Sequence, residues 1–457
     1  MARGDVRGGV TAPVERAGAA DLAMRTVGSR SPVPNQLGAV LVLDTRQEPD
    51  PGRLGPEVAR RLAAVPRLRQ RLVRLPPGAG GPAWVDDPAF DPAAHVREVP
   101  CPEPRDDRAL LDLATALVAR ALPADRPAWG VVLVPGLAGG RTGLVVIASH
   151  EVVDGIGGLA VLAHLADGAA PRPARIPAPR PRPPYPVLVA DAARARVRAV
   201  RRWRSWLRAL RRSLAAGGGL SAAPAAPCSL LAPTGSRRCA AAVRVDLAAL
   251  RAAAHAAGGT VNDALLVAVT GALSALLAAR WEAVDPVVVV VMVTARRSAG
   301  LAELGNAATP LVVPVPVAGE PGDRLRRFAG TVRRARDQAT APPLVALLGP
   351  LFRALAGTGA YHWYLSRQRR FHTLVSDVPG PDRPVTVAGV PVTAVVPVAV
   401  GEAGNVTVAF DALSYAGTLM VTAVADPERL PDLPVLVAAL ERELAALVSR
   451  PVPAASS

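Results

Sequence analysis

The chain has 457 residues, a length typical of two or three domains, and half of its residues are hydrophobic, which is enough for a large core. All 53 of its basic residues are arginines, and the lack of lysine excludes P-loop nucleotide hydrolysis, pyridoxal catalysis and protein-kinase chemistry. A net charge of +16 suits an anionic partner, but aromatic residues are only 3% of the chain, which argues against a dedicated nucleic-acid-binding protein.

Cysteine usage and hydropathy limit the setting in which the protein works. Cys101, Cys228 and Cys239 form no C-x-x-C pair, so we predict neither a disulfide framework nor a metal site and expect a reducing cytosol. The first 25 residues lack the apolar core of a signal peptide. No stretch approaches the roughly 18 apolar residues that cross a bilayer, so we expect no transmembrane span.

The N-terminal part of the chain predicts one α/β domain over residues 36–168. The preceding residues 1–35 are polar and rich in Gly and Arg, and we expect them to be partly disordered apart from a short helix over 20–27. Apolar runs and helical periodicity then predict the elements of the domain. The strands are expected at 38–43, 70–75, 130–134 and 143–148, and the helices at 56–65, 108–122 and 157–165.

Residues 169–220 are predicted to link this domain to a second one. Their first part, 169–185, contains so many prolines that we expect an extended linker. Behind it, a helix is predicted over 190–215, because apolar residues recur every three or four positions and arginines occupy the rest of its circumference. The apolar stripe contains Val200, Trp203, Leu207, Leu210 and Leu214, and the arginines are Arg201, Arg202, Arg204, Arg208 and Arg212.

Two interpretations of this cationic amphipathic helix stay open. Its stripe can pack against the protein while the arginines are simply solvated. Alternatively, the stripe can enter an anionic lipid interface while the arginines contact the head groups. In that case the residues at the lipid surface are Trp203, Leu207, Leu210, Arg201, Arg204 and Arg208.

A second α/β domain is predicted over 221–449, followed by a tail at 450–457. Thr260 and Asp263 have the spacing of a capping box at the start of a long helix. The helices are expected at 247–257, 260–280, 323–339, 344–356, 361–369 and 433–448. The strands are expected at 239–245, 287–293, 311–317, 373–377, 385–387, 392–396, 406–412 and 419–424. The two halves have similar size and texture, which would suit a pseudo-dimer with a cleft between them.

Among the six histidines, His150 has the most informative surroundings. It follows the predicted strand 143–148 and opens an H-x-x-x-D-G element with Asp154 and Gly155 at a strand-to-helix turn. An imidazole has an ordinary pKa near 6.5, so it can take a proton from an attacking alcohol or amine at cellular pH and return it later. A loop histidine followed by a turn-forming Asp-Gly pair explains the same residues without catalysis, so this element alone does not decide.

The same turn also matches a dinucleotide-binding fingerprint. Gly155, Gly157 and Ala160 read G-x-G-x-x-A between a strand and a helix, but this interpretation requires a second strand that ends in an acidic residue about 20 residues later. The sequence there is RIPAPRPRPP, which has neither, so the interpretation is rejected. The chain also has no G-x-S-x-G element, which argues against a serine hydrolase.

Several motifs occur in an order that resembles one known family. They are DRPAW at 125–129, the H-x-x-x-D-G element, Asn262-Asp263, Gly305-Asn306, SDVPGP at 376–381 and SYAG at 414–417. This set resembles the bacterial wax ester synthases and acyl-CoA:diacylglycerol acyltransferases, which are relatives of chloramphenicol acetyltransferase and of peptide-synthetase condensation domains. The resemblance spans about residues 60–450. It implies an α/β fold of two chloramphenicol-acetyltransferase-like domains, a pseudo-dimer with a channel between them.

The resemblance implies a role for each residue of the histidine motif. His150 would deprotonate the acceptor hydroxyl, which then attacks the acyl-CoA thioester without a covalent acyl-enzyme. Asp154 would have a structural role, and Gly155 would allow a close approach of the backbone. The family usually has a further histidine immediately before the catalytic one, and this chain has Ser149 there. Because of that departure, the possibility that the enzyme has reduced activity stays open.

Other residues are implied to shape the channel. Asn262 and Asp263 would line it from the C-terminal half, although a plain helix N-terminus explains them equally well. Pro379 and Gly380 would form a tight turn near the cleft, and Ser376 would donate a hydrogen bond to the developing oxyanion. The SDVPGP turn has an aspartate where the family has asparagine, which could mean a different substrate.

The resemblance implies an O-acyltransferase that moves a fatty acyl group from acyl-CoA to diacylglycerol, giving triacylglycerol, or to a long-chain alcohol, giving a wax ester. It implies no cofactor besides acyl-CoA as co-substrate, no metal and no nucleic-acid partner. We expect a cytoplasmic enzyme in peripheral contact with the inner face of the cell membrane or with lipid droplets. Two alternatives stay open: a condensation or polyketide-associated acyltransferase that uses a carrier-protein thioester, and a catalytically silent lipid-binding relative.

Overall fold

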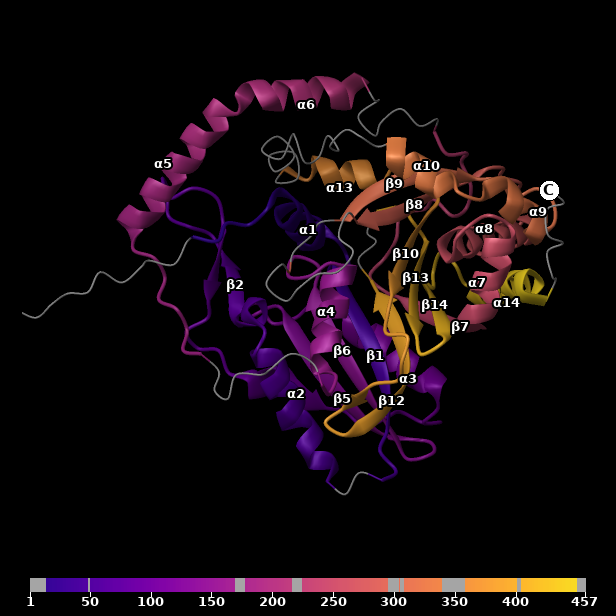
Figure 1. The fold of residues 1–457 in the computed structure, drawn as a ribbon, viewed down its shortest axis with the longest axis horizontal. Helices are drawn as coiled ribbons and strands as arrows, with labels where there is room; N and C mark the ends of the chain where they lie inside the picture. The colour runs from indigo at the N-terminus through magenta and orange to yellow at the C-terminus, as the bar shows by residue number, and fades with distance from the viewer. Residues whose placement is uncertain are drawn as a thin grey trace, which may run out of the picture.

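The computed structural model describes residues 14–47, 50–168, 177–215, 224–294, 304, 308–338, 358–400 and 404–449. Within these residues the chain forms two mixed six-stranded sheets with helices packed on them (Figure 1). A small third sheet pairs β2 (Gln70–Val73) with β3 (Ala83–Asp86). The predicted α/β fold with two halves is therefore confirmed.

The first sheet has the strand order β11-β12-β1-β6-β5-β4. Its strands are β1 (Gln36–Asp44), β4 (Val96–Glu98), β5 (Trp129–Leu137), β6 (Arg141–Ser149), β11 (Thr386–Val387) and β12 (Val390–Ala399). Seven consecutive residues of β6 are buried, because helices cover both faces of the sheet. Helices α2 (Leu54–Ala63) and α4 (Gly155–Leu165) pack on one face, and α3 (Asp107–Val118) packs on the other.

Two strands of the first sheet come from the C-terminal half of the chain. β12 pairs antiparallel with β1, from Leu37 opposite Ala399 to Leu43 opposite Val392, and β11 pairs with β12. The division predicted from the sequence, 36–168 and 221–449, does not anticipate this exchange. The first sheet is complete only with strands from both halves.

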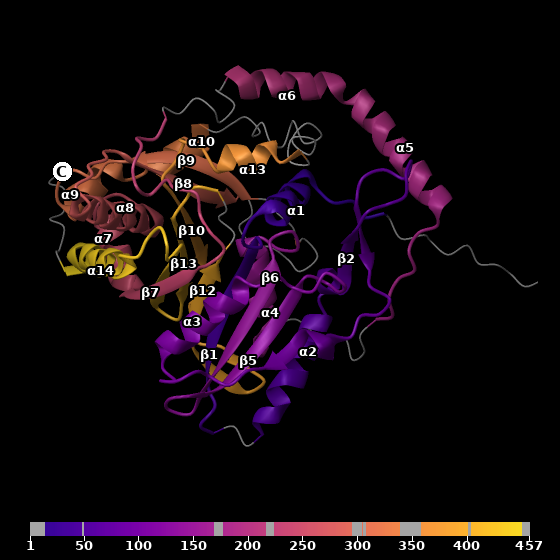
Figure 2. The same ribbon diagram turned by 180° about the vertical axis from the view of Figure 1, so that it is seen from behind.

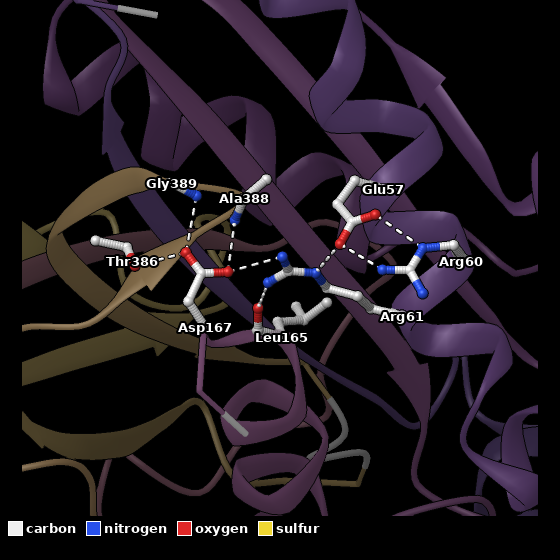
Figure 3. Close-up of polar contacts among 8 residues, drawn as sticks. All are labelled: Glu57, Arg60, Arg61, Leu165, Asp167, Thr386, Ala388 and Gly389. Carbon is white, nitrogen blue, oxygen red and sulfur yellow. Dashed lines mark hydrogen bonds and ion pairs between the residues drawn. The ribbon is translucent and has the colours of Figure 1, made fainter. Parts of the chain in front are cut away.

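An ion-pair cluster, the Asp167 cluster, fastens the exchanged hairpin to the N-terminal half (Figure 3). Asp167, which follows α4, accepts hydrogen bonds from Thr386 Oγ1 at 2.6 Å and from Gly389 N at 2.7 Å. Its other carboxylate oxygen pairs with Arg61 of α2 at 2.7 Å, and Arg61, only 4% exposed, also pairs with Glu57. Burial alone would raise the pKa of Asp167, but the hydrogen bonds from the hairpin and the Arg61 charge hold it below its usual value.

The second sheet has the order β7-β14-β13-β10-β8-β9. Its strands are β7 (Cys239–Asp246), β8 (Val287–Thr294), β9 (Ala308–Val315), β10 (Thr373–Pro379), β13 (Val408–Tyr415) and β14 (Thr418–Ala425). Helices cover one face: α7 (Leu247–Ala256), α8 (Val261–Ala279), α9 (Pro321–Phe328) and α14 (Leu433–Ser449). The other face meets the first sheet where β12 packs on β13 and β14. We call this junction, together with β10 and α4, the seam.

Helix α8 is apolar enough to cross a membrane by length and composition. It has 19 residues and a mean hydropathy of 1.8, so the expectation that no stretch approaches a membrane-spanning length was wrong. The helix packs against α14, α7 and α9, and 72% of its most apolar window is buried inside the protein. Its position at the centre of the C-terminal core explains this composition.

Two predicted long helices are interrupted. The helix expected at 323–339 is divided into α9 and α10 (Thr331–Gln338), because Gly330 between them adopts a left-handed φ of 71°. The helix expected at 190–215 begins earlier and is divided into α5 (Tyr185–Arg201) and α6 (Trp203–Ala215) by a non-helical Arg202. The helix expected at 361–369 is α13 (Ala360–Leu365), and that at 344–356 lies outside the described residues.

Helices α5 and α6 form an arm along the outside of the molecule, away from both sheets (Figures 1 and 2). Several apolar side chains of the arm are exposed, among them Val200 at 68%, Trp203 at 51% and Trp206 at 40%, whereas Leu188 and Ala192 of α5 are buried. The interpretation in which the stripe packs closely on the protein is therefore wrong for Val200 and Trp203. Helix α1 (Ala19–Arg30) contains the short helix expected over 20–27 and is longer; it lies between the arm and the first sheet and buries Leu22.

Candidate active site

His150 lies in a tight turn at the end of β6. Its backbone N–H donates to the Asn35 carbonyl oxygen at 3.0 Å, and the N–H of Ser149 donates to that of Ala128 at 2.9 Å. The turn closes with a 2.9 Å hydrogen bond from Val152 N to the Ser149 carbonyl oxygen. The backbone of His150 is thereby fixed to Asn35, the residue before β1, and His150 is half-buried.

Asp154 and two glycines begin α4 directly behind this turn. Asp154 is the N-cap: its Oδ1 accepts from Gly157 N at 2.7 Å, and its side chain is 3% exposed. A Cβ at Gly157 would lie 3.2 Å from Asp154 Oδ1 and 3.3 Å from Leu304 Cδ2, so a side chain would crowd both neighbours. Asp154 therefore sets where the helix starts, which is compatible with the structural role that the resemblance implies.

Gly155 brings this turn against the C-terminal half. A Cβ on it would lie 3.2 Å from Val378 Cγ2, so α4 and β10 approach closely at this point. β10 runs parallel to β13 with Val378 opposite Leu413 and Ser376 opposite Asp411. Because strand side chains alternate, Ser376 lies on the same face of β10 as Val378, the face toward α4. The histidine motif and the SDVPGP motif, far apart in sequence, thus meet at the seam.

The SDVPGP and SYAG motifs meet at Gly380. The Gly380 N–H donates to Ser414 Oγ at 3.1 Å, and a Cβ on Gly380 would lie 2.1 Å from the Ser414 carbonyl oxygen. No side chain fits at this distance. Pro379 ends β10 immediately before this contact and is exposed.

Asn262 and Asp263 lie at the start of α8. Asp263 Oδ2 accepts from Thr260 N and Thr260 Oγ1, both at 2.9 Å, and from Gly330 N at 3.4 Å. Thr260 and Asp263 thus form the predicted capping box of α8. All of these contacts lie within the C-terminal half. The Oδ1 atoms of Asn262 and Asp263 are buried and have no hydrogen-bond partner in the described part of the chain, which a plain helix cap does not explain. Gly305 and Asn306 lie outside the described residues.

Sequence reasoning missed two acidic side chains at the seam. Glu151, next to His150, has a pKa raised by burial, although Arg25 of α1 lies 3.7 Å away and opposes the shift. Asp411 accepts a hydrogen bond from Ala399 N at 3.0 Å, and burial raises its pKa to about 7 against that bond. The signal for Asp411 was available: it is a lone charge in the predicted strand 406–412.

Asp411 is connected to the His150 turn through three paired strands, β12, β1 and β6. Ala399 of β12 is opposite Leu37 of β1, and Leu37 is opposite Ala148, two residues before His150. Asp377 of β10, on the opposite face from Ser376, has a pKa raised to about 6 by burial. The described residues contain no group of three or more His, Cys, Asp or Glu side chains placed to hold a metal ion.

Comparison with known proteins identifies the family. The model described as the wax ester synthase/diacylglycerol acyltransferase catalytic domain matches residues 18–265, more than half of the chain. The chain belongs to this family. The model of the family's C-terminal domain matches residues 304–448. The resemblance inferred from the motifs is confirmed.

Relatives and solved structures agree with this assignment. The chain is 28% identical over 426 residues to a Mycobacterium tuberculosis protein named probable diacylglycerol O-acyltransferase, covering 90% of this chain and 91% of that protein. It superposes on the wax ester synthase/diacylglycerol acyltransferase from Marinobacter aquaeolei with a TM-score of 0.66 and 22% identity, over 93% of this chain and 97% of that one. The chain is an acyltransferase of this family.

A second solved structure extends the fold comparison. The first condensation domain of the calcium-dependent antibiotic synthetase, in complex with a substrate analogue, matches with a TM-score of 0.61 and 18% identity, over 98% of each chain. At this identity the likeness concerns the fold. It shows that the chain has the same overall fold as this condensation domain.

Gly380→Ala is expected to destabilise this family member by about 2 kcal/mol, because the new methyl group must displace the backbone of β13. Denaturant unfolding measures the change. Gly322→Ala in α9 is the matched control, since its new Cβ would have its nearest neighbour, Arg326 Nη1, at 4.0 Å. We expect that control to unfold at the same or a higher denaturant concentration. Equal midpoints for the two variants would contradict the close approach at Gly380.

The raised pKa of Asp411 predicts a pH-dependent stability. The folded protein keeps a proton on Asp411 up to a pKa of about 7, whereas the unfolded chain loses it near the ordinary value of 3.8. Between these values the folded state binds more protons, so the free energy of unfolding falls as pH rises from about 4 to 7. Asp411→Asn keeps an acceptor for Ala399 N and should raise stability at pH 8 by about 2 kcal/mol.

Denaturant unfolding of the two proteins at several pH values measures this effect. The wild type should lose stability between pH 5 and 8 more steeply than Asp411→Asn. Asp377→Asn serves as the comparison, since the pKa of Asp377 is raised less and its own contribution should end near pH 6. Parallel pH profiles for wild type and Asp411→Asn would show that Asp411 is ionised in the folded protein at neutral pH.

Proposed function

We propose that this enzyme transfers a fatty acyl group from acyl-CoA to the hydroxyl group of diacylglycerol or of a long-chain alcohol, with His150 as the general base. The observation that carries the proposal is the contact between Gly155 and Val378, since it brings the His150 turn to the seam between the halves. The names of the family and of the mycobacterial relative support diacylglycerol as an acceptor.

The proposed reaction is a direct acyl transfer. The neutral imidazole of His150 takes the proton from the acceptor hydroxyl, and the acceptor oxygen forms a bond to the thioester carbonyl carbon. The C–S bond of the tetrahedral intermediate then breaks, and the CoA thiolate receives the proton from the imidazolium. The products are an ester and free CoA, with no covalent acyl-enzyme and no net proton change.

Two further residues are proposed to support this reaction. Ser376 lies on the face of β10 toward α4, where its hydroxyl is proposed to donate a hydrogen bond to the oxyanion. Asn262 is proposed to face a polar substrate group, because its Oδ1 is buried without a hydrogen-bond partner among the described residues. The channel between the halves remains a prediction.

The test measures CoA release and lipid product with palmitoyl-CoA as donor. Dioleoylglycerol, hexadecanol and no acceptor are compared under identical conditions. Acceptor-dependent CoA release supports the proposal, and the preferred acceptor distinguishes triacylglycerol from wax ester synthesis. CoA release that ignores the acceptor, or no turnover with either acceptor, overturns it and favours a carrier-protein-dependent or catalytically silent relative.

We also propose that the α5–α6 arm docks the enzyme on an anionic lipid surface, at the inner face of the membrane or on lipid droplets. Trp203 is exposed on α6, and the centroid of its indole ring lies 5.7 Å from the Arg204 guanidinium. Leu207 and Leu210 lie further along the apolar side of the helix and are half-buried. An exposed apolar side flanked by arginines is the arrangement that binds the interface of anionic membranes. The exposed arginines on this helix and just before it are Arg201, Arg202, Arg204, Arg208 and Arg211.

Vesicle flotation tests the arm. Binding to phosphatidylcholine vesicles that contain phosphatidylglycerol should fall when Trp203 is replaced with Ser, and should fall with added salt. Trp281→Ser is the matched control, because Trp281 is 97% exposed but lies outside the arm. An equal loss of vesicle binding in both variants, or binding that does not depend on phosphatidylglycerol, would contradict docking through the arm.

A further inference from the structure

A cavity of about 650 Å³ lies between the two sheets at the end far from His150. Its lining includes Val42 and Asp44 at the end of β1 and Arg141 at the start of β6, whereas His150 follows the other end of β6. At the usual rise of a strand, Arg141 lies about 26 Å from the other end of β6, and the lining extends along β1 only as far as Val40, which is opposite Val145 in the middle of β6. Its volume is in the range of about 300–1,000 Å³ that small-molecule sites have. The lining contains none of the residues of the candidate active site, so the cavity is a separate site.

The walls of this cavity are apolar and come from both halves of the chain. Helix α3 packs on β7 beside the first sheet and forms one wall, while β-strands form most of the rest and Val437 of α14 also contributes. The apolar side chains of the lining include Val40, Val42, Leu110, Leu111, Ala242 and Met420. None of the described residues in the lining is aromatic, so the cavity has no ring on which a nucleotide base could stack.

The charged residues of the lining carry a net positive charge. They are four arginines and two aspartates: Arg46, Arg108, Arg141, Arg244, Asp44 and Asp107. Three of the arginines are neutralised by carboxylates, in the pairs Arg46–Asp44, Arg141–Asp107 and Arg108–Asp112, at 2.6, 2.7 and 2.9 Å. Arg244 of β7 is exposed and has no ion pair or hydrogen bond among the residues that the structure describes.

We propose that this cavity binds a single-chain fatty carboxylate, with its alkyl chain against the apolar walls and its carboxylate on Arg244. An aliphatic lining without aromatic rings suits a saturated chain, and a cation left without a carboxylate suits one anionic head group. The guanidinium of Arg244 can donate two parallel hydrogen bonds to the carboxylate. The site does not depend on acyl transfer, so it can be tested in an inactive protein.

Photolabelling with a diazirine-bearing palmitate locates bound chains on the full-length protein. We expect saturable labelling of peptides that contain residues 240–246 or 36–44, and competition by unlabelled laurate. Arg244→Glu should lower this labelling at least fivefold, because it places a carboxylate opposite the head group. Arg251→Glu, with the same charge change at an exposed position of α7 outside the lining, should leave it unchanged. Labelling of 150–160 provides an internal reference for chains bound near His150.

A second pair of measurements protects the test against misfolding or nonspecific partitioning. Ala242→Phe fills the cavity from its wall and should also reduce labelling of 36–44. The affinity of competing carboxylates should rise roughly tenfold for each two methylene groups from octanoate to laurate. Dodecanol should compete at least fivefold less well than laurate. Labelling confined to 150–160, or labelling of 240–246 that Arg244→Glu leaves intact, overturns the proposal. Equal competition by laurate and dodecanol overturns the role of Arg244.

Discussion

His150→Ala is expected to lower kcat for acyl transfer by about 10²–10⁴-fold, the usual contribution of a general base. The KM for palmitoyl-CoA should change much less, because the proposed role of the imidazole begins only when the acceptor loses its proton. The turn itself should survive, since backbone hydrogen bonds from His150 N to the Asn35 carbonyl oxygen and from Val152 N to the Ser149 carbonyl oxygen remain. Steady-state kinetics with the preferred acceptor measures the split between kcat and KM.

His255→Ala is the matched control for this variant. His255 lies exposed on α7 in the C-terminal half, and its removal should leave both constants unchanged. Circular dichroism and the unfolding midpoint of His150→Ala should remain those of the wild type. If His150→Ala retained more than a tenth of the wild-type kcat, a different group would have to accept the proton.

Asp167→Ala is expected to reduce the free energy of unfolding by about 3 kcal/mol. The substitution leaves the buried Arg61 guanidinium with less compensation, and it removes the acceptor for Thr386 Oγ1 and Gly389 N. Because these donors lie on the exchanged hairpin, activity should fall together with stability as the seam loosens. Urea unfolding and activity at increasing temperature measure the two effects.

Asp44→Ala serves as the comparison for Asp167→Ala. Asp44 also pairs with an arginine, Arg46, but that guanidinium is largely exposed, so no measurable change in the unfolding midpoint is expected. Asp167→Asn should be intermediate, since it keeps an acceptor but loses the charge. Similar midpoints for Asp167→Ala and Asp44→Ala would mean that the Asp167 cluster does not hold the hairpin.

Local patterns in the sequence were sufficient to predict most elements and the position of the histidine turn. The apolar run before His150 and the Asp154-Gly155 pair after it are neighbours in sequence, so strand, turn and helix start could be inferred together. The capping box of α8 was predicted for the same reason, since Thr260 and Asp263 are three residues apart. Interactions of this kind need no knowledge of the tertiary fold.

Features that depend on distant residues were not predicted. The pairing of Leu37 with Ala399 joins residues far apart in the chain, and nothing in either strand names its partner. The burial of Glu151 and Asp411 likewise depends on what packs over them, so their raised pKa values could not be inferred, although the lone charge in the predicted strand 406–412 was a signal for Asp411. The exposure of Trp203 was left as one of two alternatives, because amphipathicity alone does not say what a stripe faces.

The strand exchange also sets an order of events during synthesis. Strand β1 is among the first to leave the ribosome, but its neighbour β12 ends only at Ala399. Until then one edge of β1 has unpaired backbone groups that can pair with another chain. The nascent N-terminal half therefore has to wait for most of the polypeptide before its sheet is closed, and it needs protection from aggregation during that interval.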